Sequence, residues 1–214
     1  MFRKLDFKFN DDAVKKILYI TKQIDKCTIL DHNKLQDYIF YDYEEGSEEK
    51  DFCEKFKKQI ENQTKESGLF YDHRIIDFPY KKLIEYLPKA LLEKEIPNLR
   101  WQKFGARSAI PAHIDIDRLC SINFYISVSN ETTLFYNKKR SGFSFKIKNE
   151  KNANESFLDE WLEPTVSFIA QQYDVYLLNS SQPHAVLNTT EKDRISLQFS
   201  FKKTPFDVVN QLIE

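Results

Sequence analysis

The segment 194–201, RISLQFSF, constrains the fold more than any other part of this chain. Its apolar residues alternate without a break with Arg, Ser, Gln and Ser. Successive side chains of a β-strand point to opposite faces, so the pattern predicts a strand with one apolar and one polar face. The segment 119–128, LCSINFYISV, is divided in a similar way, and its polar side is formed by Ser121, Asn123, Tyr125 and Ser127.

The second half of the chain contains more short runs of this kind, beginning near Leu99. Strands are predicted at 132–136, 143–147, 165–169 and 174–178. Polar stretches at 137–142 and 148–156 are predicted to be loops. Many short strands separated by polar turns are typical of an antiparallel sandwich or barrel.

The first half of the chain favours helices. Residues 2–9 predict an edge strand, and the acidic pair that follows it predicts a helix start at Asp11. An amphipathic helix is expected over 48–66, with its charges on a solvated face, and another over 80–95, between two prolines. The last apolar run, FDVVNQLI, predicts a closing helix.

We therefore expect a single domain over 1–214 of mainly β structure with flanking helices. Its parts are N-terminal support over 1–98, a strand-rich core over 99–202 and a C-terminal helix over 203–214. Hydrophobic residues make up 41% of the chain, which is enough for a sizeable core. A scarcity of glycine, only 4 residues, argues against a glycine-rich phosphate loop.

Charge and cysteine content limit the class of protein further. The net charge of −1 gives no reason to expect a nucleic acid or a membrane as a partner. The N-terminus lacks the apolar run of a signal peptide, and no segment approaches the roughly 20 apolar residues of a membrane span. Three unpaired-looking cysteines favour a reducing compartment, so we expect a cytoplasmic protein.

The stretch PAHIDIDR, 111–118, holds one of only four histidines. His113 and Asp115 are two residues apart, so in an extended strand their side chains point to the same side and can meet one ion. This H-x-D pair is a weak signal alone, because a hydrogen-bonding role fits as well. Asp117 is an alternative to Asp115 as the ligand.

His184, in the segment LLNSSQPHAVLN, is the candidate third ligand. Two histidines and one carboxylate form the facial triad of non-haem iron(II), which leaves coordination positions open. The remaining histidines, His32 and His73, lie in the polar contexts DHN and DHR, which predict helical or loop surface positions.

Arg194 begins the alternating strand on its polar side, with Ser196 two residues later. If the apolar side packs on helices, the arginine points into the barrel, and a buried guanidinium needs an anion. A guanidinium beside a hydroxyl suits a carboxylate. Together with Ser121, Asn123 and Tyr125, these residues predict an interior that holds a small polar ligand.

The order His113-x-Asp115, a strand, His184 and then Arg194-x-Ser196 resembles the 2-oxoglutarate- and iron(II)-dependent oxygenase superfamily, with its prolyl-hydroxylase-like members. The resemblance covers about 99–202 and includes RLCSINFYIS, TTLFY and YDVYLLNSSQPHAVLNTTEKDRISLQFSF. It implies a double-stranded β-helix (jelly-roll, cupin-like) core braced by N-terminal helices.

The resemblance also implies the roles of the site residues. His113, Asp115 and His184 would bind Fe(II), and Arg194 would bind the distal carboxylate of 2-oxoglutarate with help from Ser196. Tyr125 is expected to contact the same carboxylate, and Ser121 and Asn123 are further candidates on that face. These eight positions are the predicted catalytic, metal and cosubstrate residues.

The implied activity is hydroxylation of a protein side chain, a free amino acid or another small molecule. The cosubstrates would be 2-oxoglutarate and O2, the products would include succinate and carbon dioxide, and ascorbate could stimulate turnover. Two alternatives stay open: a cupin-like iron dioxygenase that does not use 2-oxoglutarate, and a non-catalytic jelly-roll interaction module.

Several other residues have two interpretations. Arg107 and Tyr136 could line the pocket, although structural roles suit them as well. Trp101 and Trp161 are expected in the core or at a rim. The basic stretch 138–151 fits either a solvated hairpin or a lid over an acidic substrate.

Overall fold

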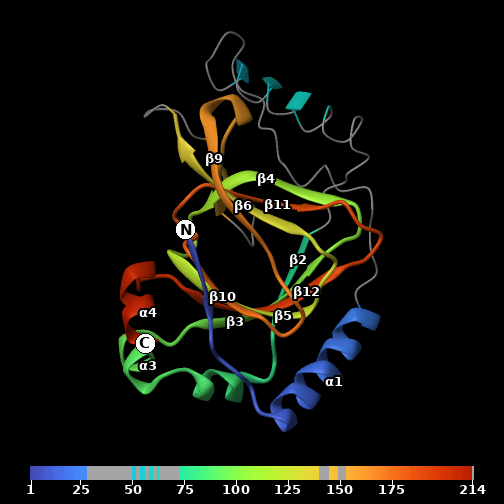
Figure 1. The fold of residues 1–214 in the computed structure, drawn as a ribbon, viewed down its shortest axis with the longest axis vertical. Coiled ribbons are helices and arrows are strands. Elements are labelled where there is room, and N and C mark those ends of the chain that lie inside the picture. Colours follow the sequence, from blue (N-terminus) through green and yellow to red (C-terminus); the bar gives the residue numbers. More distant parts are fainter. Residues whose placement is uncertain are drawn as a thin grey trace.

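In the computed structural model, the protein is built from two six-stranded antiparallel sheets, and the helices Asp11–Cys27, Lys89–Lys94 and Phe206–Leu212 lie on the side of one of them (Figure 1). The structure describes residues 1–27, 50, 51, 54, 55, 58, 59, 62, 73–139, 145–148 and 153–213. Sheet A contains, in spatial order, β1 (Phe2–Leu5), β10 (Val175–Leu178), β5 (Cys120–Ser127), β12 (Arg194–Phe201), β3 (Asn98–Phe104) and β2 (His73–Asp77). Sheet B contains β7 (Phe145–Lys148), β8 (Ala153–Ser156), β4 (Ser108–Asp115), β11 (His184–Asn188), β6 (Thr132–Lys138) and β9 (Leu162–Ile169).

The chain crosses repeatedly between the two sheets. It passes from β4 in sheet B to β5 in sheet A and back to β6, and later from β10 in sheet A to β11 in sheet B and back to β12. This alternation between facing sheets is the topology of a double-stranded β-helix, or jelly roll. The predicted fold class, mainly β with flanking helices, is therefore confirmed.

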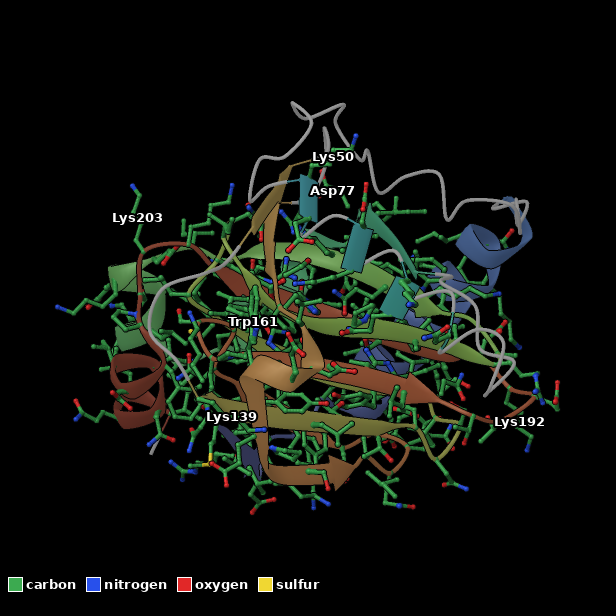
Figure 2. All side chains as sticks on the ribbon, turned by 90° about the horizontal axis from the view of Figure 1, so that it is seen from above. Lys50, Asp77, Lys139, Trp161, Lys192 and Lys203 are labelled. Atoms are coloured by element: carbon green, nitrogen blue, oxygen red, sulfur yellow. The ribbon has the colours of Figure 1, made fainter. Side chains whose placement is uncertain are left out.

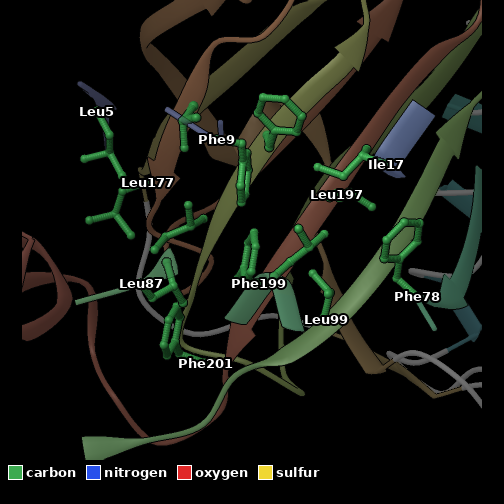
Figure 3. Close-up of a cluster of buried hydrophobic side chains, with 14 of the residues drawn as sticks. Leu5, Phe9, Ile17, Phe78, Leu87, Leu99, Leu177, Leu197, Phe199 and Phe201 are labelled. Atoms are coloured by element: carbon green, nitrogen blue, oxygen red, sulfur yellow. The ribbon is translucent and has the colours of Figure 1, made fainter. Parts of the chain in front are cut away.

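The apolar side of sheet A packs against the helices, as its alternating sequence predicts. The helices are α1 (Asp11–Cys27), the 3-10 turn η2 (Lys81–Tyr86), α3 (Lys89–Lys94) and α4 (Phe206–Leu212); a further 3-10 turn, η3 (Asp159–Trp161), precedes β9. Figure 3 shows Leu197, Phe199 and Phe201 of β12 in one buried cluster with Ile17 of α1. Each fully buried side chain of this size contributes roughly 1.5–3 kcal/mol of burial free energy.

The opposite side of sheet A faces sheet B. Because β12 lies between β3 and β5, the polar residues of these three strands gather on one wall of the space between the sheets. The charged side chains of Lys192 and Lys203, just beyond the two ends of β12, project outward (Figure 2). None of the described helices combines the length and hydrophobicity that a membrane crossing needs.

Most predicted elements are present, and β12 has the predicted bounds of 194–201. The edge strand predicted at 2–9 is shorter, because β1 ends at Leu5. The predicted loop at 137–142 is partly wrong, since β6 continues to Lys138, and residues 140–142 lie outside the described part of the chain. Residues 143 and 144 of the strand predicted at 143–147 are also outside it.

The single helix predicted over 80–95 is wrong. Two short helices occupy this region, η2 and α3, separated at Leu87 and Pro88. A residue that precedes proline is sterically disfavoured in the helical region, and Leu87 is accordingly extended, with ψ 152°. The internal proline therefore ends the first helix and starts the second.

Two further expectations need correction. The loop predicted at 148–156 ends in a strand, because β8 (Ala153–Ser156) pairs with both β4 and β7. His73, expected in a helix or loop, begins β2, which pairs with β3. In both cases backbone pairing with a strand distant in sequence decided the local structure.

Some expectations fall on residues that are not described. His32 lies outside the described part of the chain, as do most of the basic stretch 138–151 and most of the helix predicted at 48–66. The described residues of that last segment, among them Lys50 and Asn62, are helical.

Candidate metal centre

The pairing of β4 with β11 brings two histidines together. These strands are antiparallel, and His113 is the direct partner of His184 in the register. Asp115, two residues further along β4, shares the inward face of His113. Two strands that are about 70 residues apart in the sequence thus place an imidazole, a carboxylate and a second imidazole on one face of sheet B.

The three side chains converge on a common point. His113 Nε2 lies 3.6 Å from Asp115 Oδ1, and His184 Nε2 lies 3.8 Å from Asp115 Oδ2. The ligand atoms all lie within 4.8 Å of one another, and all three residues are buried. No other group of three histidine, cysteine or acidic side chains with this geometry occurs within the described residues.

Each histidine is held in the tautomer that a metal ligand needs. His113 Nδ1 is 2.8 Å from the carbonyl oxygen of Pro111, and His184 Nδ1 is 2.9 Å from that of Gln182. A backbone carbonyl only accepts, so each Nδ1 carries the proton and donates it. Both Nε2 atoms are consequently left with a lone pair that points at the shared site.

Asp115 accepts a hydrogen bond from Arg118, which lies in the following loop. Arg118 Nε donates to Asp115 Oδ2 at 2.8 Å, and Arg118 Nη2 lies 2.8 Å from Oδ1. The second approach is close in distance but lacks hydrogen-bond geometry, because Oδ1 remains a buried oxygen without a hydrogen bond. Oδ1 is therefore the oxygen that is free to bind a cation.

The surroundings shift the pKa values of Asp115 and His184 in the directions that metal binding requires. Burial acts to raise the pKa of Asp115, but the Arg118 charge and the two histidines outweigh it and hold that pKa well below its usual range. Burial, together with the neighbouring His113, lowers the pKa of His184 to about 4. At neutral pH the aspartate is an anion and His184 is neutral, as metal ligation requires.

The site opens into a cavity between the two sheets that is lined mainly by polar side chains. Its wall includes the three candidate ligands together with residues of β3, β4, β5, β6, β10, β11 and β12. The remaining lining residues are Gln102, Ile110, Arg118, Ser121, Asn123, Tyr125, Thr133, Leu178, Ser180, Val186, Arg194 and Gln198.

This wall carries polar atoms that nothing in the described protein satisfies. Ser121 Oγ, Asn123 Oδ1, the Tyr125 hydroxyl, and Arg194 Nε and Nη1 are all buried without a hydrogen-bond partner. An unsatisfied buried polar group costs roughly 1–3 kcal/mol, so native proteins keep few of them. Their concentration around one cavity indicates a site for a polar ligand.

Arg194 is the only residue of this wall, apart from Arg118, that carries a full positive charge. Its guanidinium carbon lies 5.3 Å from the centre of the Phe104 ring and 5.4 Å from that of Tyr125. The nearest acid is Glu131, whose Oε1 is 3.7 Å from Arg194 Nη1. Arg194 thus offers free donors to an anion in the same cavity as the candidate metal ligands.

The structure brings most of the sequence-predicted residues to this cavity. Ser121, Asn123 and Tyr125 lie on its wall with Arg194, and burial raises the pKa of Tyr125 to about 12, which keeps its hydroxyl neutral. Ser196 is not among the lining residues: its hydroxyl lies 3.4 Å from the side-chain oxygen of Gln102, which does line the wall.

Four other residues that the sequence left open lie outside the candidate metal centre and the cavity wall. Asp117 is not part of the converging group and instead pairs with Arg100 and Arg118. Arg107 forms an ion pair with Glu191 rather than lining the cavity. Tyr136 packs beside a small cluster around Phe157, and Trp101 is fully buried in the core.

Sequence reasoning did not single out several residues of this region, among them Gln102, Arg118, Glu131 and Gln198. Gln198 could have been found, because it continues the polar face of β12. The position of Arg118, three residues after Asp115, also carried a signal. Gln102 and Glu131 gave none, because their orientation depends on strand pairing and on a turn.

The donor set fits a divalent transition metal. Two imidazole nitrogens and one carboxylate oxygen suit iron, and equally manganese, cobalt, nickel or zinc. His113 and His184, through Nε2, and Asp115, through Oδ1, would hold such an ion. The unsatisfied Asp115 Oδ1 and the two free Nε2 atoms are the observations that support this fit.

Comparison with known proteins gave matches among solved structures only. No family's sequence profile matches the chain, and no curated protein does. HygX from Streptomyces hygroscopicus, solved with nickel and 2-oxoglutarate bound, is 11% identical, with 95% of this chain and 84% of that chain covered and a TM-score of 0.49.

Two other similar structures are larger proteins. The ribosomal oxygenase YcfD of Escherichia coli is 10% identical over 59% of this chain and 28% of that chain, with a TM-score of 0.38. An oxalate decarboxylase of Lactobacillus farciminis is 12% identical over 62% of this chain and 29% of that chain, with a TM-score of 0.33. This chain therefore spans less than a third of either protein.

Proposed function

We propose that this chain is a 2-oxoglutarate- and Fe(II)-dependent dioxygenase. One observation carries the proposal: two histidine Nε2 atoms and a carboxylate oxygen, all free to bind, converge in a buried cavity that also contains an arginine with unsatisfied donors. A metal site alone would fit many enzymes. The additional anion-binding group is what favours a dicarboxylate cosubstrate.

Each residue has a role in this proposal. His113, His184 and Asp115 would hold the iron, with Asp115 binding through Oδ1 because Arg118 holds Oδ2. Arg194 would bind the distal carboxylate of 2-oxoglutarate through charge-assisted hydrogen bonds. Tyr125, which is neutral, can donate its hydroxyl proton to the same carboxylate.

When bound, iron(II) and 2-oxoglutarate supply oxidative decarboxylation by O2 to succinate and carbon dioxide, coupled to hydroxylation of a substrate. The protein's own contribution is to orient the cosubstrate between the metal ligands and Arg194 and to limit access of water. The position of the cavity between the two sheets serves both purposes. We infer that the substrate is a small molecule or a peptide or protein side chain.

Aerobic incubation with iron(II), ascorbate and 2-oxoglutarate tests the proposal directly. We expect slow release of succinate even without the prime substrate, and inhibition by zinc, which takes the same ligands. A His184→Ala variant is the matched control, since it removes one ligand. Succinate release no higher than in this control would contradict the proposal and favour a cupin-like iron enzyme or a non-catalytic module.

A further inference from the structure

A buried glutamate, Glu131, lies next to the arginine that would bind the cosubstrate. The two side chains are almost fully enclosed, with exposed fractions of 1% for Glu131 and 5% for Arg194. Oε1 of the glutamate is 3.7 Å from Nη1 of the arginine, too long for a hydrogen bond. The contact is thus a charge–charge interaction that leaves the guanidinium donors available.

The glutamate is held in place by its own turn and does not depend on Arg194. The backbone N–H and the hydroxyl of Ser129 donate to Glu131 Oε2 at 3.1 and 3.2 Å. Between them, Asn130 adopts a left-handed conformation, with φ 59°, which asparagine tolerates better than most residues. This turn between β5 and β6 directs the Glu131 side chain inward.

Arg194 is likewise positioned without Glu131. Its backbone is part of β12 and pairs with Phe104 of β3, and its guanidinium lies against the rings of Phe104 and Tyr125. Cation–π contacts of this kind stabilise a buried guanidinium without using its N–H donors. The two opposite charges are therefore fixed near each other by separate parts of the fold.

We propose that Glu131 is an internal counter-ion that competes with the cosubstrate's carboxylate for the charge of Arg194. This inference rests on the proposed function. Without a bound carboxylate, the guanidinium of Arg194 would be buried unpaired, which is costly, and the charge of Glu131 would neutralise it. An incoming carboxylate is attracted by Arg194 but repelled by Glu131, so its binding free energy at this end of the cavity is less favourable.

This arrangement would select among anions. A simple carboxylate gains little binding free energy beside an arginine whose charge is already balanced by Glu131. A ligand that also binds the metal through its other end gains at both sites and is therefore favoured. Glu131 would lower the affinity of both kinds of ligand by the same factor. Carboxylates that lack a chelating group would then bind too weakly to occupy the cavity, whereas 2-oxoglutarate or a closely similar keto acid, which is held at both ends, would still bind.

The test is a comparison of ligand affinities in Glu131→Gln and the wild-type protein. Glutamine keeps the size of the side chain, and its carbonyl can still accept from Ser129, so only the charge is removed. Two unit charges roughly 7 Å apart at an effective dielectric constant of about 20 correspond to about tenfold to a hundredfold in affinity. Calorimetric titration of the Mn(II)-loaded protein with 2-oxoglutarate, and separately with succinate, measures this change.

We expect Glu131→Gln to bind both ligands about tenfold to a hundredfold more tightly. Glu163→Gln, the same substitution on an exposed position of β9, is the control and should leave both affinities unchanged. If Glu131→Gln fails to fold, Glu131→Asp withdraws the carboxylate from Arg194 and should give a smaller gain in the same direction.

The possible outcomes separate this inference from the proposed function. If the wild type binds 2-oxoglutarate and the folded Glu131 variant binds it equally or more weakly, Glu131 is only a structural support for Arg194 and the inference is wrong. If neither protein binds 2-oxoglutarate or succinate, the proposed function is wrong and the inference falls with it. Tighter binding by the variant, with an unchanged control, would support both.

Discussion

The two faces of sheet A are made by the same strands, yet they differ in how completely their side chains are satisfied. On the outer face, Leu197, Phe199 and Ile122 are fully buried and pack against apolar side chains of the helices. On the inner face, Asn123 and Arg194 have buried polar atoms without a partner. The outer face therefore holds the fold together, whereas the inner face remains incomplete without a ligand.

The difference shows how an alternating strand divides stability from function. Burial of one large apolar side chain contributes roughly 1.5–3 kcal/mol, and each unsatisfied polar group on the other side costs a similar amount. A chain selected for stability alone would fill the inner face with apolar residues. Retention of a polar, unsatisfied wall beside two histidines and an aspartate is the physical reason to look for a ligand there.

The largest expected effect comes from removing the carboxylate of Asp115, the proposed metal ligand. Asp115→Ala should abolish metal binding and succinate release, because the remaining two imidazoles are a poor site for iron. Asp117→Ala, two residues away, should retain much of both, because Asp117 only pairs with Arg100 and Arg118. Metal analysis after dialysis and a succinate assay measure the pair. The reverse pattern would overturn the assignment of Asp115.

The second prediction tests the outer face. Phe199→Ala should lower the free energy of unfolding by about 3–5 kcal/mol, because it leaves a cavity in a well-packed cluster. Asn123→Ala on the inner face should change it by less than about 1 kcal/mol, because its side-chain oxygen makes no hydrogen bond. Urea denaturation of both variants provides the measurement. Equal losses would mean that the two faces contribute equally to stability.

The third prediction tests the inner face through the cosubstrate. Arg194→Ala should weaken the binding of 2-oxoglutarate by about 30-fold to several-thousand-fold and leave the affinity for iron within a few-fold of the wild-type value. Arg194→Lys should recover only part of the loss, since it keeps the charge without the forked donors. Ser196→Ala should cost much less, because Ser196 contacts Gln102 rather than the cavity. Anaerobic titration of the iron-loaded protein, followed by its visible charge-transfer band, compares them.

The fourth prediction concerns Arg118, which donates a hydrogen bond to the proposed metal ligand Asp115. Arg118→Met should reduce Mn(II) affinity by about tenfold to a hundredfold, because residues that orient a metal ligand have effects of this size. Arg100→Met, which removes only the outer link to Asp117, should have a smaller effect. Competition with a metal indicator gives both values. Wild-type affinity in Arg118→Met would show that Asp115 is held well enough without it.

The smallest expected effect is a pH dependence of stability. Burial lowers the pKa of His184 to about 4 from the ordinary value of 6.5. Between these two pH values the imidazole is therefore protonated in the unfolded chain and neutral in the folded protein. This residue's contribution to stability is present above pH 6.5 and is lost as the pH falls toward 4. Between about pH 7 and about pH 5.5 the metal-free protein should lose about 1 kcal/mol, and His184→Gln should lose less. Denaturant titrations at several pH values would detect the difference.

Much of the site could be predicted from the sequence because its signals are local. The strict alternation of 194–201 fixed which side chains share a face, and the two-residue spacing of His113 and Asp115 placed both on one side of a strand. These patterns follow from the two-residue period of extended chain, which does not depend on neighbouring strands. The fold class followed from the same patterns and from the resemblance they carry.

Only the tertiary structure decided how these faces meet. The register of β4 and β11 places His113 opposite His184. The turn that contains Asn130, which has a left-handed backbone, places the Glu131 side chain beside Arg194. Ser196 shares its strand face with Arg194, yet it contacts Gln102 of β3 instead of the cavity. The sequence determined the side of the sheet on which each residue lies, because that depends on the chain's own period. Its partner across the barrel depends on long-range pairing, which no local pattern encodes.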